Sequence, residues 1–169
     1  VAVAEVAGER AQLKWPNDVL VAGLKVAGIL VEGRPQEAWL AVGIGINVAL
    51  RDADLEADEL RGRAGTLGLE PDAVQPTLAA LLVALERWLP APVDSVLDAV
   101  RARDALLGKP VAWADGEGTG AGIDRDGRLL VRARGGALEA LSAGEIHLHA
   151  TGRVASDWPN AATSSSHIP

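Results

Sequence analysis

The sequence contains no cysteine, so disulfide bonds and thiolate metal sites are excluded. It has only three histidines and no run close to the roughly eighteen apolar residues of a membrane span. No basic stripe is present, and the formal charge of −7 argues against a nucleic-acid-binding surface. The first residues lack the basic and apolar regions of a signal peptide. We therefore expect a soluble, cytoplasmic protein without membrane or nucleic-acid partners.

Lysine and asparagine are also scarce, with three residues of each type. Two of the lysines, Lys14 and Lys25, and two of the asparagines, Asn17 and Asn47, fall within a short stretch of 34 positions, residues 14–47. Chance is a weaker explanation where a scarce residue type clusters. The 169 residues are 49% hydrophobic, which is enough for a core. A functional site is therefore expected in the N-terminal third, supported by a buried core.

Hydrophobic periodicity predicts an α+β fold whose first part contains a mixed or antiparallel sheet. A helix should end at Gly8, and a hairpin should turn at Gly23. The region 51–73 is expected to be a loop with one short helical turn at most. The predicted strands are 11–14, 19–22, 25–32 and 38–50, and the predicted helices are 75–89 and 93–106.

The pattern of residue types changes after Lys109, where short β-rich runs alternate with Gly and Asp turns. Such spacing is typical of a small barrel or sandwich-like module. The expected strands are 111–114, 118–123, 128–133, 137–141 and 145–149. The tail lacks periodicity and is predicted to be disordered. The sequence thus divides into residues 1–107, 108–152 and 153–169.

The segment LKWPND places a cation, an amide and a carboxylate around a proline at a strand end. Proline fixes its own φ near −65°, so Asn17 and Asp18 should lie in a defined turn. The alternative is a loop made of ordinary turn-forming residues. Spacing alone does not separate the two interpretations.

The strand 25–32 begins with a lysine on an otherwise apolar face. Period-two alternation places Lys25 with Ala27, Ile29 and Val31, and it places Gly28 on the other face. Lys25 is either a snorkelling edge residue or a cation that reaches a phosphate or carboxylate.

The strand 38–48 has two unlike faces. One face is predicted to be buried and consists of Leu40, Val42, Ile44, Ile46 and Val48; the other consists of Trp39, Ala41, Gly43, Gly45 and Asn47. Glycines on a strand leave the sheet surface bare, which indicates close approach of a ligand or close packing by a helix. A dinucleotide-binding fingerprint is rejected, because Val48 stands where the third glycine is needed.

His147 and His149 alternate on one predicted strand and share a face. Two histidines without a third ligand do not make a metal site, so no metal site is predicted.

Three blocks, KWPND (14–18), KVAGILVE (25–32) and VGIGINV (42–48), together resemble the catalytic domain of biotin–protein ligases, the biotin–[acetyl-CoA-carboxylase] ligases. LGKPV (107–111) and AGEIHLH (143–149) resemble the SH3-like C-terminal domain of that family. The resemblance covers about residues 1–150. It implies part of a class II synthetase-like catalytic domain, followed by a small SH3-like barrel.

The resemblance implies a ligase that uses biotin, ATP and Mg²⁺. The biotin carboxylate attacks the α-phosphate of ATP, and a lysine of a biotin carboxyl carrier protein domain then attacks biotinyl-5′-AMP. No covalent enzyme intermediate is needed, so the lack of cysteine is no obstacle. The site has to supply positioning and charge stabilisation.

The resemblance also carries residue roles. Lys25 would contact biotinyl and phosphate oxygens, and Asn47 would line the adenine site. Asp18 would orient the incoming amine. The glycines of the flat biotin-binding surfaces are Gly28, Gly43 and Gly45, and the motif beside the nucleotide supplies Lys14, Trp15, Asn17 and Asp18.

The sequence departs from the family pattern in its first residues. Only thirteen residues precede Lys14, so the Gly/Arg-rich loop that covers the phosphates is absent, as are the Ser and Gln residues of the biotin pocket. His149 stands where some relatives carry Arg. We therefore expect an incomplete enzyme with little activity alone. The alternatives are a non-catalytic remnant, a carrier-docking module or a lipoate-ligase-like protein, and a homodimer is compatible with each.

Overall fold

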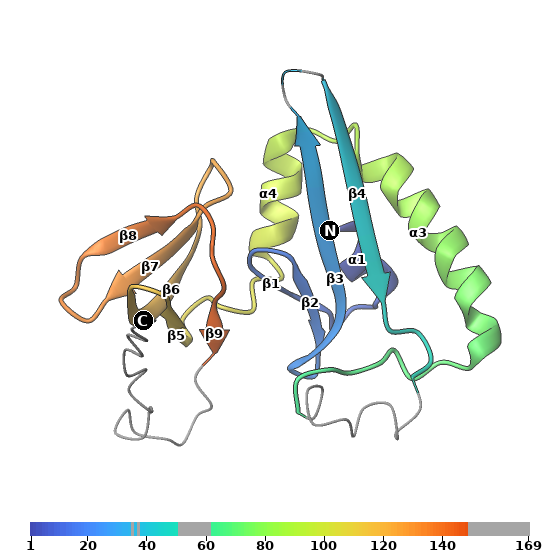
Figure 1. The fold of residues 1–169 in the computed structure, drawn as a ribbon, viewed down its shortest axis with the longest axis horizontal. Helices are drawn as coiled ribbons and strands as arrows, with labels where there is room; N and C mark the ends of the chain where they lie inside the picture. The colour runs from blue at the N-terminus through green and yellow to red at the C-terminus, as the bar shows by residue number, and fades with distance from the viewer. Residues whose placement is uncertain (35, 37, 51–61, 149–169) are drawn as a thin grey trace, which may run out of the picture.

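The computed structural model describes residues 1–34, 36, 38–50 and 62–148, and it contains two antiparallel β-sheets with accompanying helices (Figure 1). The predicted α+β fold is confirmed. The elements are α1 (Ala2–Val6), β1 (Gln12–Lys14), β2 (Asp18–Val21), β3 (Leu24–Arg34), β4 (Trp39–Ile46), the 3₁₀ helix η2 (Pro71–Ala73), α3 (Val74–Trp88), α4 (Val93–Arg101), β5 (Pro110–Trp113), β6 (Gly116–Ile123), β7 (Leu129–Ala133), β8 (Leu138–Leu141) and β9 (His147–Leu148).

The first sheet has the strand order β1-β2-β3-β4, and each neighbouring pair is antiparallel. The predicted hairpin at Gly23 is confirmed. Its two turn residues, Ala22 and Gly23, have φ values of 52° and 81°. Positive φ at both positions matches the right-handed twist of the flanking strands, and glycine adopts it without strain. The strands β2 and β3 are thereby set side by side.

A first hydrophobic core lies between one face of this sheet and the helices α1 and α3. Ala4 on α1, Val19 on β2 and Leu81 on α3 are buried within it. At the surface, the Glu5 carboxylate pairs with Arg87 and accepts a hydrogen bond from the Trp88 indole N–H at 2.8 Å. The Trp88 and Arg87 donors hold the pKa of Glu5 below its usual value. These contacts fasten α3 to α1.

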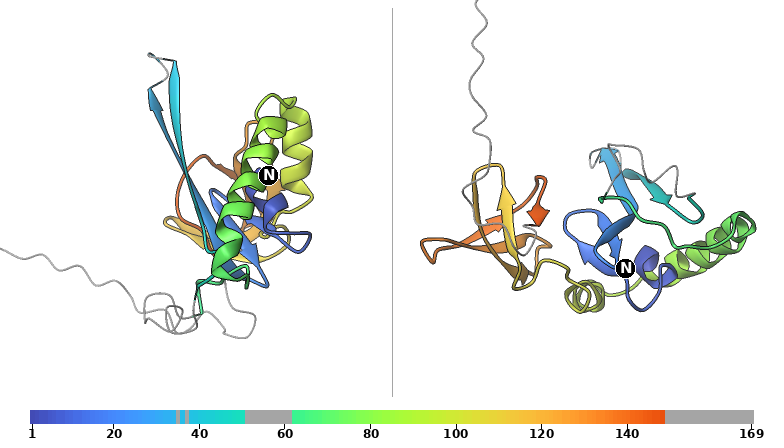
Figure 2. Two further views of the ribbon diagram at one scale, coloured as in Figure 1. Left: turned by 90° about the vertical axis from the view of Figure 1, so that its right-hand side faces the viewer. Right: turned by 90° about the horizontal axis from the view of Figure 1, so that it is seen from below.

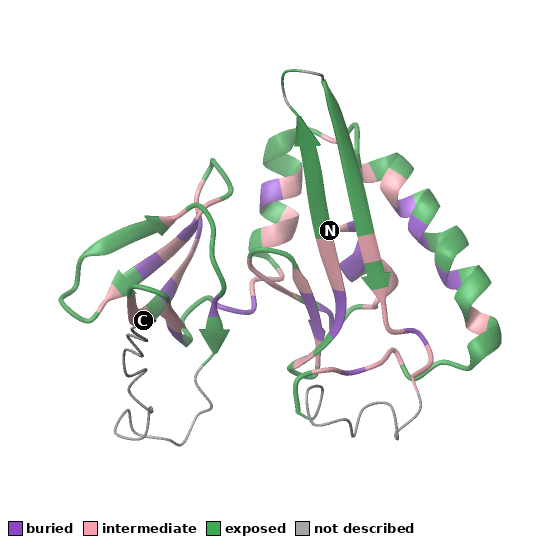
Figure 3. Cartoon of the chain, viewed as in Figure 1, coloured by how far each residue is buried: buried purple, intermediate pink, exposed green. Residues whose placement is uncertain are grey.

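The long hairpin of β3 and β4 extends beyond the helices that cover its base (Figures 2 and 3). Leu40 is 71% exposed, Val42 is 52% exposed and Val31 is 55% exposed. The prediction that the whole apolar face of β4 is buried is therefore wrong. Only its lower end, at Ile44 and Ile46, packs against the first core. No helix among the described residues packs against the outer part of β4, so its apolar side chains there stay exposed.

The second sheet has the strand order β8-β7-β6-β5-β9, and all five predicted strands are present in it. Its inner face holds a separate hydrophobic core. The fully buried members include Leu129 and Val131 on β7 and Val111 on β5. Leu97 of α4 joins this core, which explains why the amphipathic helix lies beside the second sheet.

The helix predicted over 93–106 is wrong at its C-terminal end, because α4 stops at Arg101. The following residues pair with β1 instead of continuing the helix. The Leu13 N–H donates to the Arg103 carbonyl at 2.7 Å, and the Ala105 N–H donates to the Leu13 carbonyl at 2.9 Å. Leu106 is then completely buried in the second core. Periodicity does not reveal this tertiary pairing.

The other predicted helix agrees with α3 to within one residue at each end. Within the described part of the region 51–73, the expected short helical turn corresponds to η2, whereas residues 51–61 lie outside the described residues. The prediction for the tail 153–169 lies outside the described residues. None of the helices in the described parts of the chain combines the length and apolarity that crossing a bilayer demands.

Gly120 generates a prediction for the second sheet. A Cβ atom at this position would lie 2.1 Å from the Leu106 carbonyl oxygen, so the linker and β6 approach too closely for any side chain. Gly120→Ala should lower the free energy of unfolding by about 2 kcal/mol or more, measured by chemical denaturation. Gly135→Ala is the matched control, because a Cβ there meets nothing within 4 Å. Equal stabilities of the two variants would contradict the close approach.

Candidate functional site

Four predicted site residues form one row across the first sheet. Lys14 pairs with Asp18, Asp18 with Gly28, and Gly28 with Gly45, so each strand contributes one member. Directly paired residues of antiparallel strands project to the same side of the sheet. The adjacent row points to the first core and consists of Leu13, Val19, Ala27 and Ile46. The row of predicted site residues therefore lies on the opposite, core-free face.

Lys25 joins this face because β3 contains a bulge. Val19 pairs with Ala27 but Leu20 pairs with Lys25, so Val26 is an extra residue in β3. A bulge shifts the alternation of side chains by one position. A Cβ on Gly28 would meet the Lys25 Nζ at 3.3 Å, which places the ammonium over the row. The prediction that Lys25 shares a face with Ala27 and Ile29 is therefore wrong.

The charges at the row are two cations and one anion. Lys25 Nζ lies 2.5 Å from Asp18 Oδ1, and Lys14 Nζ lies 3.6 Å from Asp18 Oδ2. The Asp18 side chain is 15% exposed, Lys14 is 18% exposed and Lys25 is 47% exposed. One positive charge is left over in a partly desolvated cluster, where charges interact more strongly than in bulk water. The cluster therefore favours an anionic ligand such as a phosphate or a carboxylate.

The glycines beside the cluster leave the sheet surface open. A Cβ at Gly45 would meet nothing within 4 Å, and a Cβ at Gly43 would meet only backbone and Cβ atoms of Leu30. No helix in the described part of the chain packs against these two positions, so the described residues favour close approach of a ligand over packing by a helix. The open face can accept a flat group laid against the strands.

The residues 62–68 hold Lys25 and Asn47 in place, and sequence analysis missed this role. The Lys25 N–H donates to the Arg63 carbonyl, and the Gly65 N–H donates to the Lys25 carbonyl, both at 2.8 Å. The Asn47 side-chain amide donates to the Gly65 carbonyl at 2.9 Å. Gly65 has to be glycine, because a Cβ would lie 2.8 Å from the Leu24 Cβ. A glycine in a loop was the only sequence signal.

Thr66 is a second missed residue of this segment. Its hydroxyl lies 3.1 Å from the Asn47 carbonyl and 3.0 Å from the Val48 carbonyl, to which it donates. It accepts hydrogen bonds from the backbone N–H groups of Leu50 and Gly68. One hydroxyl thus ties the end of β4 to the returning chain, which orients Asn47.

The remaining predicted residues, Trp15 and Asn17, lie in the turn between β1 and β2. The Trp15 indole N–H donates to the Gly127 carbonyl at 3.0 Å, and its ring packs against the second core. Asn17 is exposed, and its carbonyl accepts a hydrogen bond from the Ile29 N–H at 2.9 Å. The structure brings these two residues next to the row but not into it.

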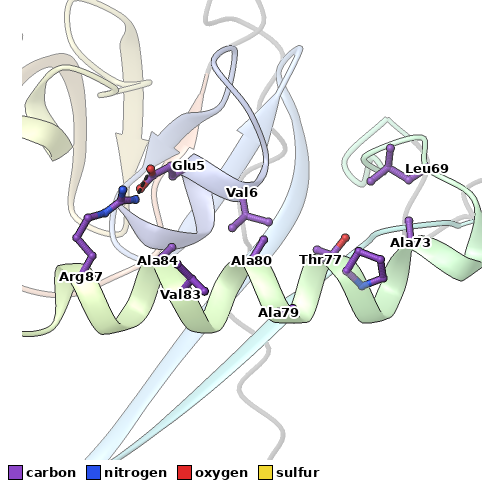
Figure 4. Close-up of a pocket in the computed structure, with 11 residues that line it drawn as sticks. Glu5, Val6, Leu69, Ala73, Thr77, Ala79, Ala80, Val83, Ala84 and Arg87 are labelled. Atoms are coloured by element: carbon purple, nitrogen blue, oxygen red, sulfur yellow. Dashed lines mark hydrogen bonds and ion pairs between the residues drawn. The ribbon is translucent and has the colours of Figure 1, made fainter.

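No group of three or more His, Cys, Asp or Glu residues that could hold a metal ion occurs among the described residues. His147 is exposed on β9, and His149 lies outside the described residues. A groove lies between α1 and α3 and is lined mainly by small apolar side chains, with Glu5 and Arg87 at one end (Figure 4). None of the predicted site residues lines that groove.

Two protein families match this chain. Residues 3–49 match the Biotin/lipoate A/B protein ligase family, and residues 106–148 match the Biotin protein ligase C terminal domain. The chain is 36% identical to the Biotin--[acetyl-CoA-carboxylase] ligase of Paracoccus denitrificans over 152 residues, which cover 81% of this chain and 62% of that protein. It is 30% identical to the Bifunctional ligase/repressor BirA of Escherichia coli over 159 residues, covering 85% and 48%. The chain thus spans less than two thirds of either relative.

The structure is similar to the biotin protein ligase from Aquifex aeolicus in complex with biotin and ATP. The TM-score is 0.67 at 27% identity, and the match covers 88% of this chain and 67% of that chain. The similarity therefore includes both sheets of the present structure.

The charge cluster generates a stability prediction. Asp18→Asn leaves the ammonium groups of Lys14 and Lys25 without their carboxylate, so the free energy of unfolding should fall by about 1–3 kcal/mol in urea denaturation. The control is Asp98→Asn, because the exposed Asp98–Arg101 pair at 3.5 Å should contribute within about 0.5 kcal/mol. A loss at Asp18 no larger than that at Asp98 would show that the cluster is an ordinary surface ion pair.

Proposed function

We propose a ligase function for this chain, which belongs to the biotin protein ligase family. The ligase forms biotinyl-5′-AMP from biotin and ATP, and then transfers biotin to a lysine of a biotin carboxyl carrier protein domain of a carboxylase. The first sheet with its helices, within residues 1–107, supplies part of the catalytic domain. We assign residues 108–152, of which the structure describes those up to Leu148, to the SH3-like C-terminal domain.

The observation that supports this proposal is the position of Lys25. The bulge at Val26 brings its ammonium to the open face, directly above Gly28 and within 2.5 Å of Asp18. The adenylation step brings a carboxylate and a triphosphate together, and their negative charges repel. A positioned cation at that point reduces the repulsion and stabilises the charge of the transition state. Lys14, on the other side of Asp18, adds a second cation to the same surface.

The glycines provide the surface on which the ligands lie. Gly43 and Gly45 present no side chains on this face, and Lys25 lies over the neighbouring Gly28, so a bicyclic ring or an extended acyl chain can approach the backbone beside the ammonium. We assign biotin to this surface and the nucleotide to the end nearer Asn47, whose amide is held by Gly65. Holding the carboxylate close to the α-phosphorus supplies a large part of the rate acceleration.

Asp18 has a separate role in the transfer step. Its carboxylate is held between two ammonium groups. We propose that it accepts a hydrogen bond from the incoming lysine amine of the carrier and directs it toward the carbonyl carbon of biotinyl-5′-AMP. The amine nitrogen then forms an amide bond and releases a proton to solvent, and AMP leaves with the pair of electrons of the broken anhydride bond.

Mg²⁺ fits this site only when the phosphates of the nucleotide supply most of its ligands. The described residues contain no cluster of carboxylates or histidines that could hold a metal ion by themselves. Mg²⁺ commonly binds through substrate phosphates with one or two carboxylates. It would supply charge neutralisation to the phosphates, and among the described residues Asp18 is the carboxylate of the charge cluster that would contribute a ligand. The roles proposed for Lys14, Lys25 and Asp18 do not depend on a contact with Mg²⁺.

Two other functions are open to direct test. A lipoate ligase is disfavoured because residues 106–148 match the biotin ligase C-terminal domain, and a competition assay with biotin and lipoate decides between them. The other is a non-catalytic remnant that keeps part of the nucleotide surface or docks a carrier domain. In calorimetry with biotinyl-5′-AMP, binding favours retained ligand recognition, and no binding leaves only a structural role. We also propose that the protein acts in the cytoplasm and that a homodimer is one of its assembly states.

Lys25→Ala tests the charge that faces the phosphate. Loss of a charged hydrogen bond of about 1.5–3 kcal/mol should weaken binding of biotinyl-5′-AMP by about 10- to 150-fold, measured by calorimetry on the full chain. Adenylate formation should fall at least as far. Lys109→Ala is the control, since Lys109 lies outside the row and precedes β5. Unchanged affinity in Lys25→Ala would remove the role proposed for this lysine.

Gly45→Val tests the open glycine surface. A Cβ atom at this position meets nothing within 4 Å, and valine is a good β former, so the melting temperature should not fall. The new side chain should nevertheless occupy the ligand surface and weaken binding of biotinyl-5′-AMP by about tenfold or more. Ala41→Val is the control on the same face, at the exposed outer part of β4. Normal affinity in Gly45→Val would show that the ligand lies elsewhere.

A further inference from the structure

We propose that Trp15 is a positioning residue, through which the second sheet holds Lys14 and Asp18 in register with Lys25. The resemblance assigns Trp15 to ligand binding, whereas the geometry assigns it to the contact between the two sheets. The consequence for ligand binding rests on the proposed function. The expected effect on the positions of Lys14 and Lys25 does not depend on that function.

Trp15 is attached to the second sheet by two kinds of contact. Its indole N–H donates to the Gly127 carbonyl at 3.0 Å, across 112 residues of sequence. Its ring packs against the second core, to which Leu97 and Leu106 belong. Trp15 is half-buried, and an indole that packs on one side and finds a partner for its N–H is held both in position and in orientation.

The acceptor of this hydrogen bond is itself rigid. Gly127 lies in the turn between β6 and β7 with a φ of 78°. The Asp124 carboxylate accepts hydrogen bonds from the backbone N–H groups of Asp126 and Arg128, both at 2.9 Å, and from the Arg128 side chain at 2.8 Å. The Trp15 indole is therefore hydrogen-bonded to a turn that the Asp124 carboxylate stabilises.

The residue on the other side of Lys14 is fastened as well. Leu13 exchanges two backbone hydrogen bonds with the segment after α4, through Arg103 and Ala105. The Arg103 guanidinium also donates to the Ala11 carbonyl at 3.1 Å. Lys14 is thus flanked by two residues that the C-terminal part of the chain holds in place.

The position of Trp15 bears directly on the charge cluster. Only three residues separate Lys14 from Asp18, and Trp15 is the first of them. A tilt of this short turn has to move the ends of both β1 and β2. Asp18 lies between two ammonium groups at unequal distances, 2.5 Å to Lys25 and 3.6 Å to Lys14. A small displacement of the turn would therefore change how Asp18 divides its contacts between the two lysines.

The lysine side chains offer a direct readout, because the chain contains only Lys14, Lys25 and Lys109. In the full chain labelled with ¹⁵N-lysine, three Nζ resonances are expected, with Lys109 as the internal reference. Trp15→Phe keeps an aromatic ring but removes the N–H donor. Trp88→Phe is the matched control, because it removes the indole N–H that donates to Glu5 at 2.8 Å, away from the row.

The expected result is a shift of the Lys14 and Lys25 Nζ resonances in Trp15→Phe, with Lys109 unchanged and with neither site lysine shifted in Trp88→Phe. Affinity for biotinyl-5′-AMP should fall by about three- to tenfold, the equivalent of one ordinary hydrogen bond. Unchanged lysine resonances in a folded Trp15→Phe protein would overturn the proposal, whatever happens to its melting temperature. Such a result would leave Trp15 a purely structural anchor.

A second variant covers the case in which Trp15→Phe does not fold. Asp124→Ala loosens the turn around Gly127 without altering Trp15, and it should shift the same two lysine resonances. No shift would overturn the proposal by an independent route. If the wild-type chain binds no biotinyl-5′-AMP, the ligase function fails, but the resonances still decide whether Trp15 positions the lysines.

Discussion

The site depends on the pairing of β2 with β3 and on the single extra residue in it. Asp18 faces Gly28 and Val19 faces Ala27, but the next pair is Leu20 with Lys25. Without the bulge at Val26, Lys25 would point to the side of Ala27, which is a core residue 3% exposed. A lysine ammonium on that side would be desolvated without a partner, at a large cost in free energy. The bulge instead places it beside Asp18 on the open face.

The two faces of the first sheet differ in role: the inner face packs into a core, and the outer face carries the predicted site residues. The inner face is held by α1 and α3, and its row of Leu13, Val19, Ala27 and Ile46 packs into the first core. The outer face holds the charged cluster and the bare glycines. Strand alternation links the two, because each residue that anchors the core fixes its neighbours on the other side. Residues next to the row are held from outside the sheet. Gly65 and Thr66 bond to Asn47, which follows β4, and the second sheet bonds to Trp15, which follows Lys14.

Local sequence patterns were sufficient for most of the elements, and they pointed to residues that the structure brings together on one sheet. The turn at Ala22–Gly23 and all five strands of the second sheet were predicted, because these features depend on neighbouring residues. Three predictions failed for tertiary reasons. Leu40 and Val42 are exposed because no described element covers the outer part of the hairpin. The helix after Val93 ends early because residues 103–105 pair with β1. Lys25 lies on the other face because of the bulge.

The sequence by itself determined which residues carry charge and which leave the backbone bare: two of only three lysines, one aspartate after a proline turn, and glycines spaced two apart on a strand. It could not determine that Lys14, Asp18, Gly28 and Gly45 form one row, since that is set by the pairing of four strands. Nor could it show that Trp15 reaches Gly127, 112 residues away. Alternation and turn propensity act over a few residues, whereas strand register, bulges and contacts between sheets are chosen by the burial of the whole core.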